Sequence, residues 1–304
     1  MSNQTTYCGF VVIIGKPNVG KSTLINQILG KKISITSRKP QTTRYNILGI
    51  DTKNNYQTIY IDTPGLHIKK KQIVNNLIKD STNKLIHDLE LIVFVIEGTN
   101  WTNDDERIIH VLKYISSPVL LVINKIDNVI NKSILLSHIN FLRKKMDFLD
   151  IIPISAKKGT YIDTFIKIIQ QNMPETTHYF PEEYITNMSK IFLAKEIIRE
   201  KLMRFLGDEL PYLIKVEIEQ FIVHKKYNYK INGIIIVIKN SQKKIVIGVK
   251  GQKIKRIGIE SRIEMEKLFS AKIYLSLWVK VKKEASNNEY YLNSLDYVFN
   301  INKI

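Results

Sequence analysis

The sequence predicts two folded domains: an α/β domain on a mostly parallel six-stranded sheet, followed by a smaller α+β domain. Three observations lead to this prediction. Short apolar runs alternate with amphipathic stretches through residue 171, a pattern typical of strands and helices in turn. A polar stretch with Pro174 and Pro181 then breaks the pattern. Beyond it, apolar and polar residues alternate and basic residues accumulate, which indicates a second unit of a different kind.

The apolar runs of the first part have the length and composition of buried strands. Parallel strands that are covered on both faces are apolar throughout. We expect them at residues 10–14, 56–61, 91–96, 119–123 and 151–154. Amphipathic stretches predict helices at residues 22–29, 104–115, 132–146 and 160–171. Residues 47–51 should form an antiparallel edge strand against 56–61, because residues 52–55 have the composition of a hairpin turn.

The second part predicts a compact α+β unit. We expect a helix at 190–205, strands near 216–222 and 233–239, a helix ending at 269 and a last strand at 273–281. In that last strand alternate residues are apolar, as in a strand with one buried face. The predicted boundaries are residues 1–175 for the first domain, 176–189 for a linker, 190–284 for the second domain and 285–304 for a polar tail.

Positive charge is concentrated in one region of the chain. The formal net charge is +18 and the isoelectric point is about 9.6. Residues 221–283 contain 16 Lys and Arg but only 3 acidic residues, a net of +13, which leaves +5 for the rest of the chain. Such a local excess indicates an anionic partner, either nucleic acid or an anionic membrane surface.

The remaining composition bounds the protein class. The single cysteine, Cys8, excludes an intrachain disulfide and a Cys-rich zinc site, and it suggests a reducing compartment. No apolar run approaches the roughly 18 residues that a membrane span needs. We therefore expect a cytoplasmic protein.

A phosphate-binding motif follows the first predicted strand. Residues 15–22 match G-x-x-x-x-G-K-[ST] between a strand and a helix, which is the context that this motif requires. The residues are Gly15, Lys16, Pro17, Asn18, Val19, Gly20, Lys21 and Ser22. Backbone N–H groups of such a loop surround phosphate oxygens, Lys21 would contact the β- and γ-phosphates, and Ser22 would bind Mg²⁺. The alternative, a strand–helix turn without a ligand, fits the full match poorly.

A second group of residues would lie near the γ-phosphate. Asp62 closes a predicted strand and is followed by Thr63, Pro64, Gly65 and Leu66. The Asp62 carboxylate could hold Mg²⁺ through a water molecule, and the Gly65 N–H could meet the γ-phosphate. Thr42 or Thr43 could ligate Mg²⁺ when the γ-phosphate is present, and we favour Thr43; a solvated loop threonine is the alternative. Asp-x-x-Gly is a weak signal alone, but it is stronger after a phosphate loop.

A third group predicts selection of guanine. Asn124, Lys125, Ile126 and Asp127 follow an apolar strand, and Ser155, Ala156 and Lys157 follow the next. The Asp127 carboxylate can accept hydrogen bonds from guanine N1–H and the 2-amino group, whereas adenine offers neither donor there. A backbone N–H of residues 155–157 could bind guanine O6. A pocket built on such bonds rejects the wrong base strongly.

The order of these motifs resembles the translation-factor-like P-loop GTPases over residues 8–172. The resemblance implies a switch with two nucleotide-sensitive loops, near residues 33–46 and 62–80, and a catalytic role for Lys21 and Gly65. Leu66 stands where many such proteins have a water-orienting Gln. In similar GTPases an Asn at the position of Asn18 helps to bind K⁺; the alternative is an amide that stabilises the local turn.

The basic region contains a G-x-x-G loop. Gly248 and Gly251 would let a nucleic-acid backbone approach closely, and neighbouring cations would neutralise it. The candidate RNA-binding residues are Lys244, Ile247, Gly248, Val249, Lys250, Gly251, Lys253, Ile254, Lys255 and Arg256. The order of helices and strands around this loop resembles a type 2 K-homology (KH) domain, which usually binds single-stranded RNA. A basic module that binds anionic lipid is the alternative.

The combination of both parts resembles the Era family of bacterial GTPases, from Cys8 to Lys283. Residues 40–44 (PQTTR) and 62–67 (DTPGLH) carry this resemblance together with the KH pattern, whereas Ala285 stands where the family usually has Trp. The resemblance implies binding to the 3′ end of 16S ribosomal RNA, a role in maturation of the 30S subunit, and a monomer. The alternatives are a membrane-surface GTPase, and a tRNA-modification or metal-transport GTPase.

Overall fold

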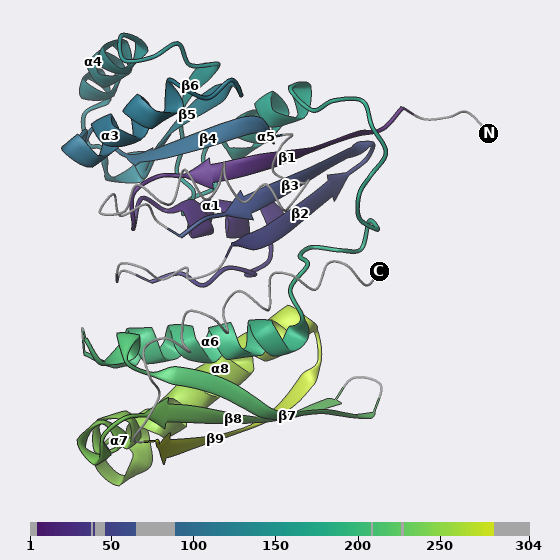
Figure 1. The fold of residues 1–304 in the computed structure, drawn as a ribbon, viewed down its shortest axis with the longest axis vertical. Coiled ribbons are helices and arrows are strands. Elements are labelled where there is room, and N and C mark those ends of the chain that lie inside the picture. Colours follow the sequence, from purple (N-terminus) through teal and green to yellow (C-terminus); the bar gives the residue numbers. More distant parts are fainter. Residues whose placement is uncertain are drawn as a thin grey trace. The chain divides into compact units, whose positions relative to one another are not determined.

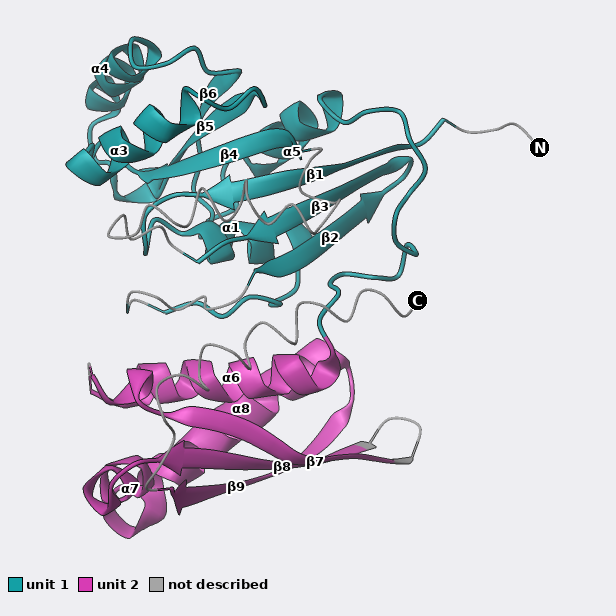
Figure 2. Ribbon diagram, in the orientation of Figure 1, with its two compact units in different colours: residues 1–188 teal, residues 189–304 magenta. Residues whose placement is uncertain are grey.

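The computed structural model describes residues 5–37, 39, 46–64, 89–207, 209–225 and 228–282. Its chain divides into two compact units, unit 1 with residues 1–188 and unit 2 with residues 189–304 (Figure 2). Each unit has its own sheet and its own hydrophobic core. No helix in the described ranges is long and apolar enough to cross a bilayer.

Unit 1 is built on a six-stranded sheet with the strand order β2-β3-β1-β4-β5-β6 (Figure 1). The strands are β1 Tyr7–Ile14, β2 Ile47–Lys53, β3 Tyr56–Asp62, β4 Leu89–Glu97, β5 Val119–Asn124 and β6 Asp150–Pro153. Only β2 runs antiparallel to its neighbour. The predicted mostly parallel sheet is therefore confirmed. A two-residue turn at Asn54 and Asn55 joins β2 to β3, and Asn54 has the positive φ of 55° that Asn tolerates well.

Helices cover both faces of this sheet. They are α1 Lys21–Leu29, α3 Asn103–Leu112, α4 Lys132–Arg143 and α5 Ile162–Gln171. Alternate residues of β1, such as Phe10 and Val12, share a core cluster with Ile108 of α3 and Leu142 of α4. On the other face α1 contacts α5. Three of these helices are shorter than the sequence predicted. After α3 the N–H groups of Tyr114 and Ile115 donate to the carbonyls three residues back, at Val111 and Leu112, so the predicted last turn is tighter than an α-helix.

The segment after α5 lies along the sheet of unit 1. The Cys8 N–H donates to Pro174 O at 3.1 Å, and the Ile50 N–H donates to Ile185 O at 2.9 Å. The fully buried Gln57 side chain donates to Phe180 O and accepts from Phe180 N. Much of the predicted linker is thus fixed to β1, β2 and β3 by hydrogen bonds, because a buried amide supplies partners to its backbone.

Unit 2 places three helices and a three-stranded sheet in the order predicted for a KH domain. The elements are α6 Lys190–Phe205, β7 Lys215–Lys225, β8 Asn228–Val237, α7 Asn240–Ile247, α8 Gln252–Phe269 and β9 Lys272–Val281. The sheet order is β7-β8-β9, with β8 and β9 parallel. In β9 the buried residues Ile273 and Val279 alternate with exposed ones, as predicted. Strand β8 begins earlier than expected, because Tyr229 and Ile231 continue its buried face.

Candidate functional site

The phosphate loop connects the end of β1 to the start of α1. Gly15 and Gly20 have φ values of 148° and 102°, a region that favours glycine. A Cβ on Gly15 would lie 2.3 Å from Val95 O, and one on Gly20 would lie 2.3 Å from Asn124 Nδ2. No other residue fits these positions without rearrangement. The loop therefore packs directly against the ends of β4 and β5, with its backbone next to the N-terminus of α1.

Lys21 is buried in the centre of this loop. Its ammonium donates to Gly15 O at 3.0 Å and to Lys16 O at 2.9 Å, and only 6% of the residue is exposed. Burial lowers the pKa of Lys21 to about 8, although the nearby Asp62 carboxylate raises it. A buried cation that is paired mainly with carbonyl groups is well suited to bind an anionic phosphate.

Ser22 and Asp62 form the candidate magnesium site. The Ser22 hydroxyl donates to Asp62 Oδ2 at 2.8 Å, and Asp62 is fully buried. Burial raises the pKa of the Asp62 carboxyl, while the Ser22 hydrogen bond and Lys21 lower it. The other oxygen, Oδ1, has no hydrogen-bond partner among the described residues. A buried carboxylate with a free oxygen beside a hydroxyl fits Mg²⁺, which prefers hard oxygen ligands.

The structure also fixes the residue after Asp62. The Thr63 hydroxyl donates to Ile13 O at 2.8 Å, which ties the end of β3 to the end of β1. Three predicted residues of this region, Thr43, Gly65 and Leu66, lie outside the described residues, as does most of the two predicted switch loops and the tail at 285–304.

The residues predicted to bind the base meet at the same edge of the sheet. Asn124 donates through Nδ2 to Val19 O at 2.8 Å and accepts at Oδ1 from the N–H groups of Lys125 and Ala156. Its amide thus holds together the phosphate loop and both predicted base loops. Asp127 accepts a 2.6 Å hydrogen bond from the Ser155 hydroxyl, which orients its carboxylate.

Lys125 and the residues around it complete this loop. Lys125 adopts a left-handed φ of 62°, and its ammonium lies 2.9 Å from a Glu97 carboxylate oxygen. The Ile126 N–H donates to Ile154 O at 3.2 Å, which joins the loop after β5 to the chain after β6. Lys157 follows Ala156 as an exposed residue of the second base loop.

In unit 2 the G-x-x-G loop lies between α7 and α8. Gly248 and Gly251 both have a φ of 73°, and Lys250 between them has a φ of 48°. A Cβ on Gly248 would lie 2.6 Å from Lys253 Cβ, whereas one on Gly251 would meet nothing within 4 Å. The side chain of Val249 is 78% exposed. The loop therefore projects an open, basic turn into solvent.

A groove of about 280 Å³ runs beside this loop between α8 and β9. Its lining residues are Ile254, Lys255, Gly258, Ile259, Arg262, Leu275 and Leu277. Of these, Ile254 and Lys255 are among the residues predicted from the sequence to bind RNA, and the other five are not. The i, i+4, i+8 spacing of Ile254, Gly258 and Arg262 places them on one face of a helix and was the available signal.

The other predicted RNA-binding residues take several positions. Ile247 packs against the core of unit 2, while Lys244 and Lys250 are exposed. Arg256 turns away from the groove lining: its guanidinium stacks 4.7 Å from the centre of the Phe205 ring and lies 3.3 Å from Glu260. The structure thus brings Ile254 and Lys255 to the groove and directs Arg256 toward α6.

Two family models match the chain: a "50S ribosome-binding GTPase" model over residues 10–125 and a "KH domain" model over residues 209–286. Together with the fold and the nucleotide site, they define a P-loop GTPase joined to a KH domain. "GTPase Era" of Yersinia enterocolitica is 57% identical over 294 residues, 97% of each chain. The chain belongs to the Era family and is a GTPase.

Solved structures of Era resemble the whole chain. Aquifex aeolicus Era bound to GDP and AlF₄⁻ is 38% identical with a TM-score of 0.84, covering 96% of this chain and 99% of its own. A structure of Era in complex with MgGDPNP and nucleotides 1506–1542 of 16S ribosomal RNA has the same identity, coverage and TM-score. These matches extend across both units.

Proposed function

We propose that this GTPase binds the 3′ end of 16S ribosomal RNA through unit 2 and assists maturation of the 30S subunit. The observation that carries the proposal is the open groove between α8 and β9, next to an exposed G-x-x-G loop in the basic region. The 38% identical Era whose structure contains 16S nucleotides supports the choice of RNA. We assign nucleotide binding to a domain of residues 1–175, RNA binding to residues 190–284, and the linker to residues 176–189.

In the proposed nucleotide site each group has a separate role. The loop N–H groups and Lys21 bind the phosphates, and Asp127 selects guanine. Ser22, Asp62 through a water molecule and, when GTP is bound, Thr43 would hold Mg²⁺, which would supply positive charge beside the phosphates. Lys21 and the Gly65 N–H then stabilise negative charge that develops on the γ-phosphate. The Leu66 side chain cannot hydrogen-bond the attacking water, so we expect either slow intrinsic hydrolysis or a water that another group positions.

Asn18 is our candidate ligand for K⁺. Its left-handed φ of 67° turns the loop at an exposed position, where an amide oxygen can reach a cation beside the phosphates. A K⁺ ion there would add positive charge near the reacting phosphate. We expect faster hydrolysis in K⁺ than in Na⁺, and Asn18→Asp should remove the difference; equal rates in both salts for the parent protein would contradict this role.

The groove offers complementary surfaces to a single RNA strand. Ile254, Ile259 and Leu277 form an apolar wall on which bases can rest. Lys250, Lys253 and Lys255 supply positive charge for the sugar–phosphate backbone, with Gly251 leaving room for it to approach. If RNA binds the GTP form and the GDP form with different affinities, RNA must change the ratio of GTP affinity to GDP affinity by the same factor. Such a coupling is typically about 1–3 kcal/mol.

The test is direct binding of a labelled oligoribonucleotide with the sequence of the 16S 3′ end, against a scrambled control. We expect the 16S oligoribonucleotide to bind tightly. Its affinity should differ between the protein loaded with GDP and the protein loaded with a non-hydrolysable GTP analogue. Lys255→Gln should weaken binding more than Lys267→Gln, which makes the same charge change on an exposed part of α8. Equal affinity for both oligonucleotides would overturn the proposed RNA target.

We place the protein in the cytoplasm as a monomer, with a weak peripheral contact of its basic region with the membrane. A membrane-surface GTPase remains the contrasting function, because Lys clusters also bind anionic lipid. Co-sedimentation with phosphatidylserine vesicles in competition with the oligoribonucleotide separates the two. If RNA releases the protein from the vesicles, the rRNA function is supported. If RNA does not release it, the membrane-surface function is supported.

A further inference from the structure

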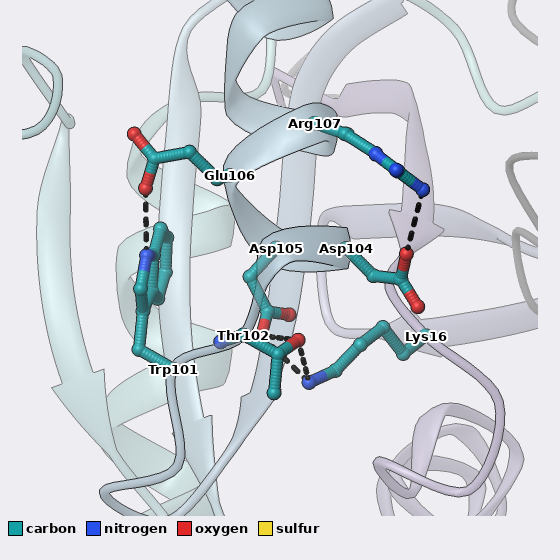
Figure 3. Close-up of polar contacts among 7 residues, drawn as sticks. All are labelled: Lys16, Trp101, Thr102, Asp104, Asp105, Glu106 and Arg107. Atoms are coloured by element: carbon teal, nitrogen blue, oxygen red, sulfur yellow. Dashed lines mark hydrogen bonds and ion pairs between the residues drawn. The ribbon is translucent and has the colours of Figure 1, made fainter.

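A buried ion pair ties the phosphate loop to helix α3. The Lys16 ammonium lies 2.6 Å from Asp105 Oδ2 and donates to the Thr102 hydroxyl at 2.8 Å (Figure 3). Lys16 is the second residue of the phosphate loop, and Asp105 lies in the first turn of α3, 89 residues later. Asp105 is fully buried and the Lys16 side chain is only 14% exposed.

The cap of helix α3 does not by itself explain why this pair is charged. Asp105 Oδ2 accepts from the Thr102 N–H, as in a capping box, and in addition from the Thr102 hydroxyl. A capping residue performs this role at an exposed position too, without the cost of burying a carboxylate. Asp105 Oδ1 is buried and has no hydrogen-bond partner within the described ranges. Lys16 therefore supplies the charge that compensates this buried carboxylate.

Lys16 also contacts the nucleotide machinery through its backbone. Its carbonyl accepts a hydrogen bond from Lys21, and two residues later Asn18 adopts its left-handed φ. The side chain is held on one side by Asp105 and the carbonyl on the other by Lys21. The outer turn of the phosphate loop is thus fixed from both sides by contacts within the protein.

We propose that Asp105 is a positioning residue of the GTPase site: through Lys16 it holds the phosphate loop in its binding conformation. A loop that is already ordered loses less conformational entropy on binding, so affinity rises without a new contact to the ligand. The effect is the same for GTP and GDP, because the loop surrounds phosphates that both share. Asp105 touches neither nucleotide nor water in this role, so it leaves the rate of the chemical step unchanged.

The neighbouring aspartate provides a matched control. Asp104 lies in the same helical turn, is half-exposed, and pairs with Arg107 at 3.3 Å rather than with the phosphate loop (Figure 3). Asp104→Asn therefore makes the same chemical change at the same helix N-terminus. Asp105→Asn keeps the shape of the side chain and removes its charge.

The experiment measures Kd for GDP and KM and kcat for GTP, with active protein counted by nucleotide stoichiometry. We expect Asp105→Asn and Lys16→Met each to raise Kd and KM about tenfold, the size of a lost charge-assisted hydrogen bond, with kcat within about twofold of the parent. Because both changes break one pair, the double variant should resemble each single variant. Lys16→Arg should restore most of the affinity, and Asp104→Asn should match the parent.

Several results would overturn the proposal. They are an unchanged KM in Asp105→Asn, strictly additive effects in the double variant, or an equal effect of Asp104→Asn. A fall in kcat with KM unchanged would instead make Lys16 or Asp105 part of the chemical step. The assay uses only GTP and GDP, so its outcome is independent of the RNA target proposed above.

Discussion

The two units present candidate anion sites of opposite design. In unit 1 the charged and polar groups are buried: Lys21 is 6% exposed, Asn124 is 2% exposed and Asp62 is fully buried. In unit 2 the groove is open. Lys255 of its lining and Lys250 of the neighbouring G-x-x-G loop are both exposed. Residues 221–283, which include the groove and its loop, carry +13 of the chain's net charge of +18.

This difference shows that a high net charge in the sequence indicates an exposed anion site but does not reveal a buried one. A buried site derives its strength from a low local dielectric and from fixed hydrogen bonds, so a few groups suffice and their charges nearly cancel. An exposed site competes with water and salt, so it needs many cations. Unit 1 should therefore discriminate strongly between ligands, and unit 2 should respond strongly to ionic strength.

The largest effect is expected in the buried site. Asp127→Asn exchanges an acceptor for a donor opposite the guanine N1–H and 2-amino group, so GTP affinity should fall by roughly 10⁴-fold. Xanthosine triphosphate should be bound preferentially, because its 2-oxo group accepts from the new amide. Competition between the two nucleotides measures the change, and unchanged GTP preference would contradict the guanine assignment.

Ionic strength should separate the two designs next. If RNA binding neutralises about four phosphates on a single strand, its affinity should drop roughly 50-fold between 50 and 200 mM salt. Nucleotide affinity in unit 1 should change much less, because buried pairs are screened less. Parallel titrations of both ligands test this, and similar salt slopes would remove the contrast.

A charge introduced into the open loop should act on unit 2 alone. Gly251 has a positive φ and free space around its Cβ position, so Gly251→Asp places a carboxylate where the RNA backbone would lie. RNA affinity should fall at least about tenfold through repulsion, while GTP hydrolysis continues. Gly251→Asn, with the same size and no charge, is the control, and loss of GTPase activity in either variant would indicate misfolding.

A single methyl group tests the apolar wall of the groove. Gly258 lies within α8, and a Cβ there would meet Leu277 Cδ1 at an ordinary 3.7 Å. Gly258→Ala should stabilise the helix by up to about 1 kcal/mol yet lower RNA affinity by about three- to tenfold, because the methyl group enters the groove. The unfolding temperature should thus rise while RNA affinity falls. Unchanged RNA affinity would mean that the bases bind outside this groove.

The smallest effect concerns pH and His138, a half-buried residue of α4. Burial lowers the pKa of His138 below its ordinary value of 6.5, partly offset by Asp105. As the pH falls, His138 therefore takes up a proton in the unfolded chain before it does so in the folded chain. Its contribution to the free energy of unfolding is complete above pH 6.5 and is lost as the pH falls through the folded pKa. His138→Phe, which keeps the stacking on Phe141, should lose less thermal stability between pH 7.5 and 5.5 than the parent. Equal losses would contradict a role for His138.

Much of this molecule follows from contiguous sequence. The phosphate loop at residues 15–22, the loop at 124–127 and the G-x-x-G loop at 248–251 are each read from neighbouring residues. The alternation of apolar runs with amphipathic stretches predicted the parallel sheet, and the turn composition of residues 52–55 predicted the β2–β3 hairpin; the structure confirms both. Helix ends were less accurate, because apolar periodicity continues past the residue where the backbone turns.

Contacts between distant segments were not predicted. Gln57 fixes Phe180 across 123 residues, and Arg256 turns to Phe205 although its sequence context suggested RNA. The groove needs Gly258 of α8 and Leu277 of β9 to face each other. Residue spacing within one segment cannot predict these pairs, because they form only when separate helices and strands pack together.

The sequence by itself determined the class of fold, the nucleotide motifs and the location of positive charge, because each is set by local spacing or by composition. Only the tertiary structure decided which groups are buried together, such as Lys16 with Asp105 and Ser22 with Asp62. The physical reason is that the cost of burying a charge, and the partner that compensates it, exist only when separate elements exclude water from one place.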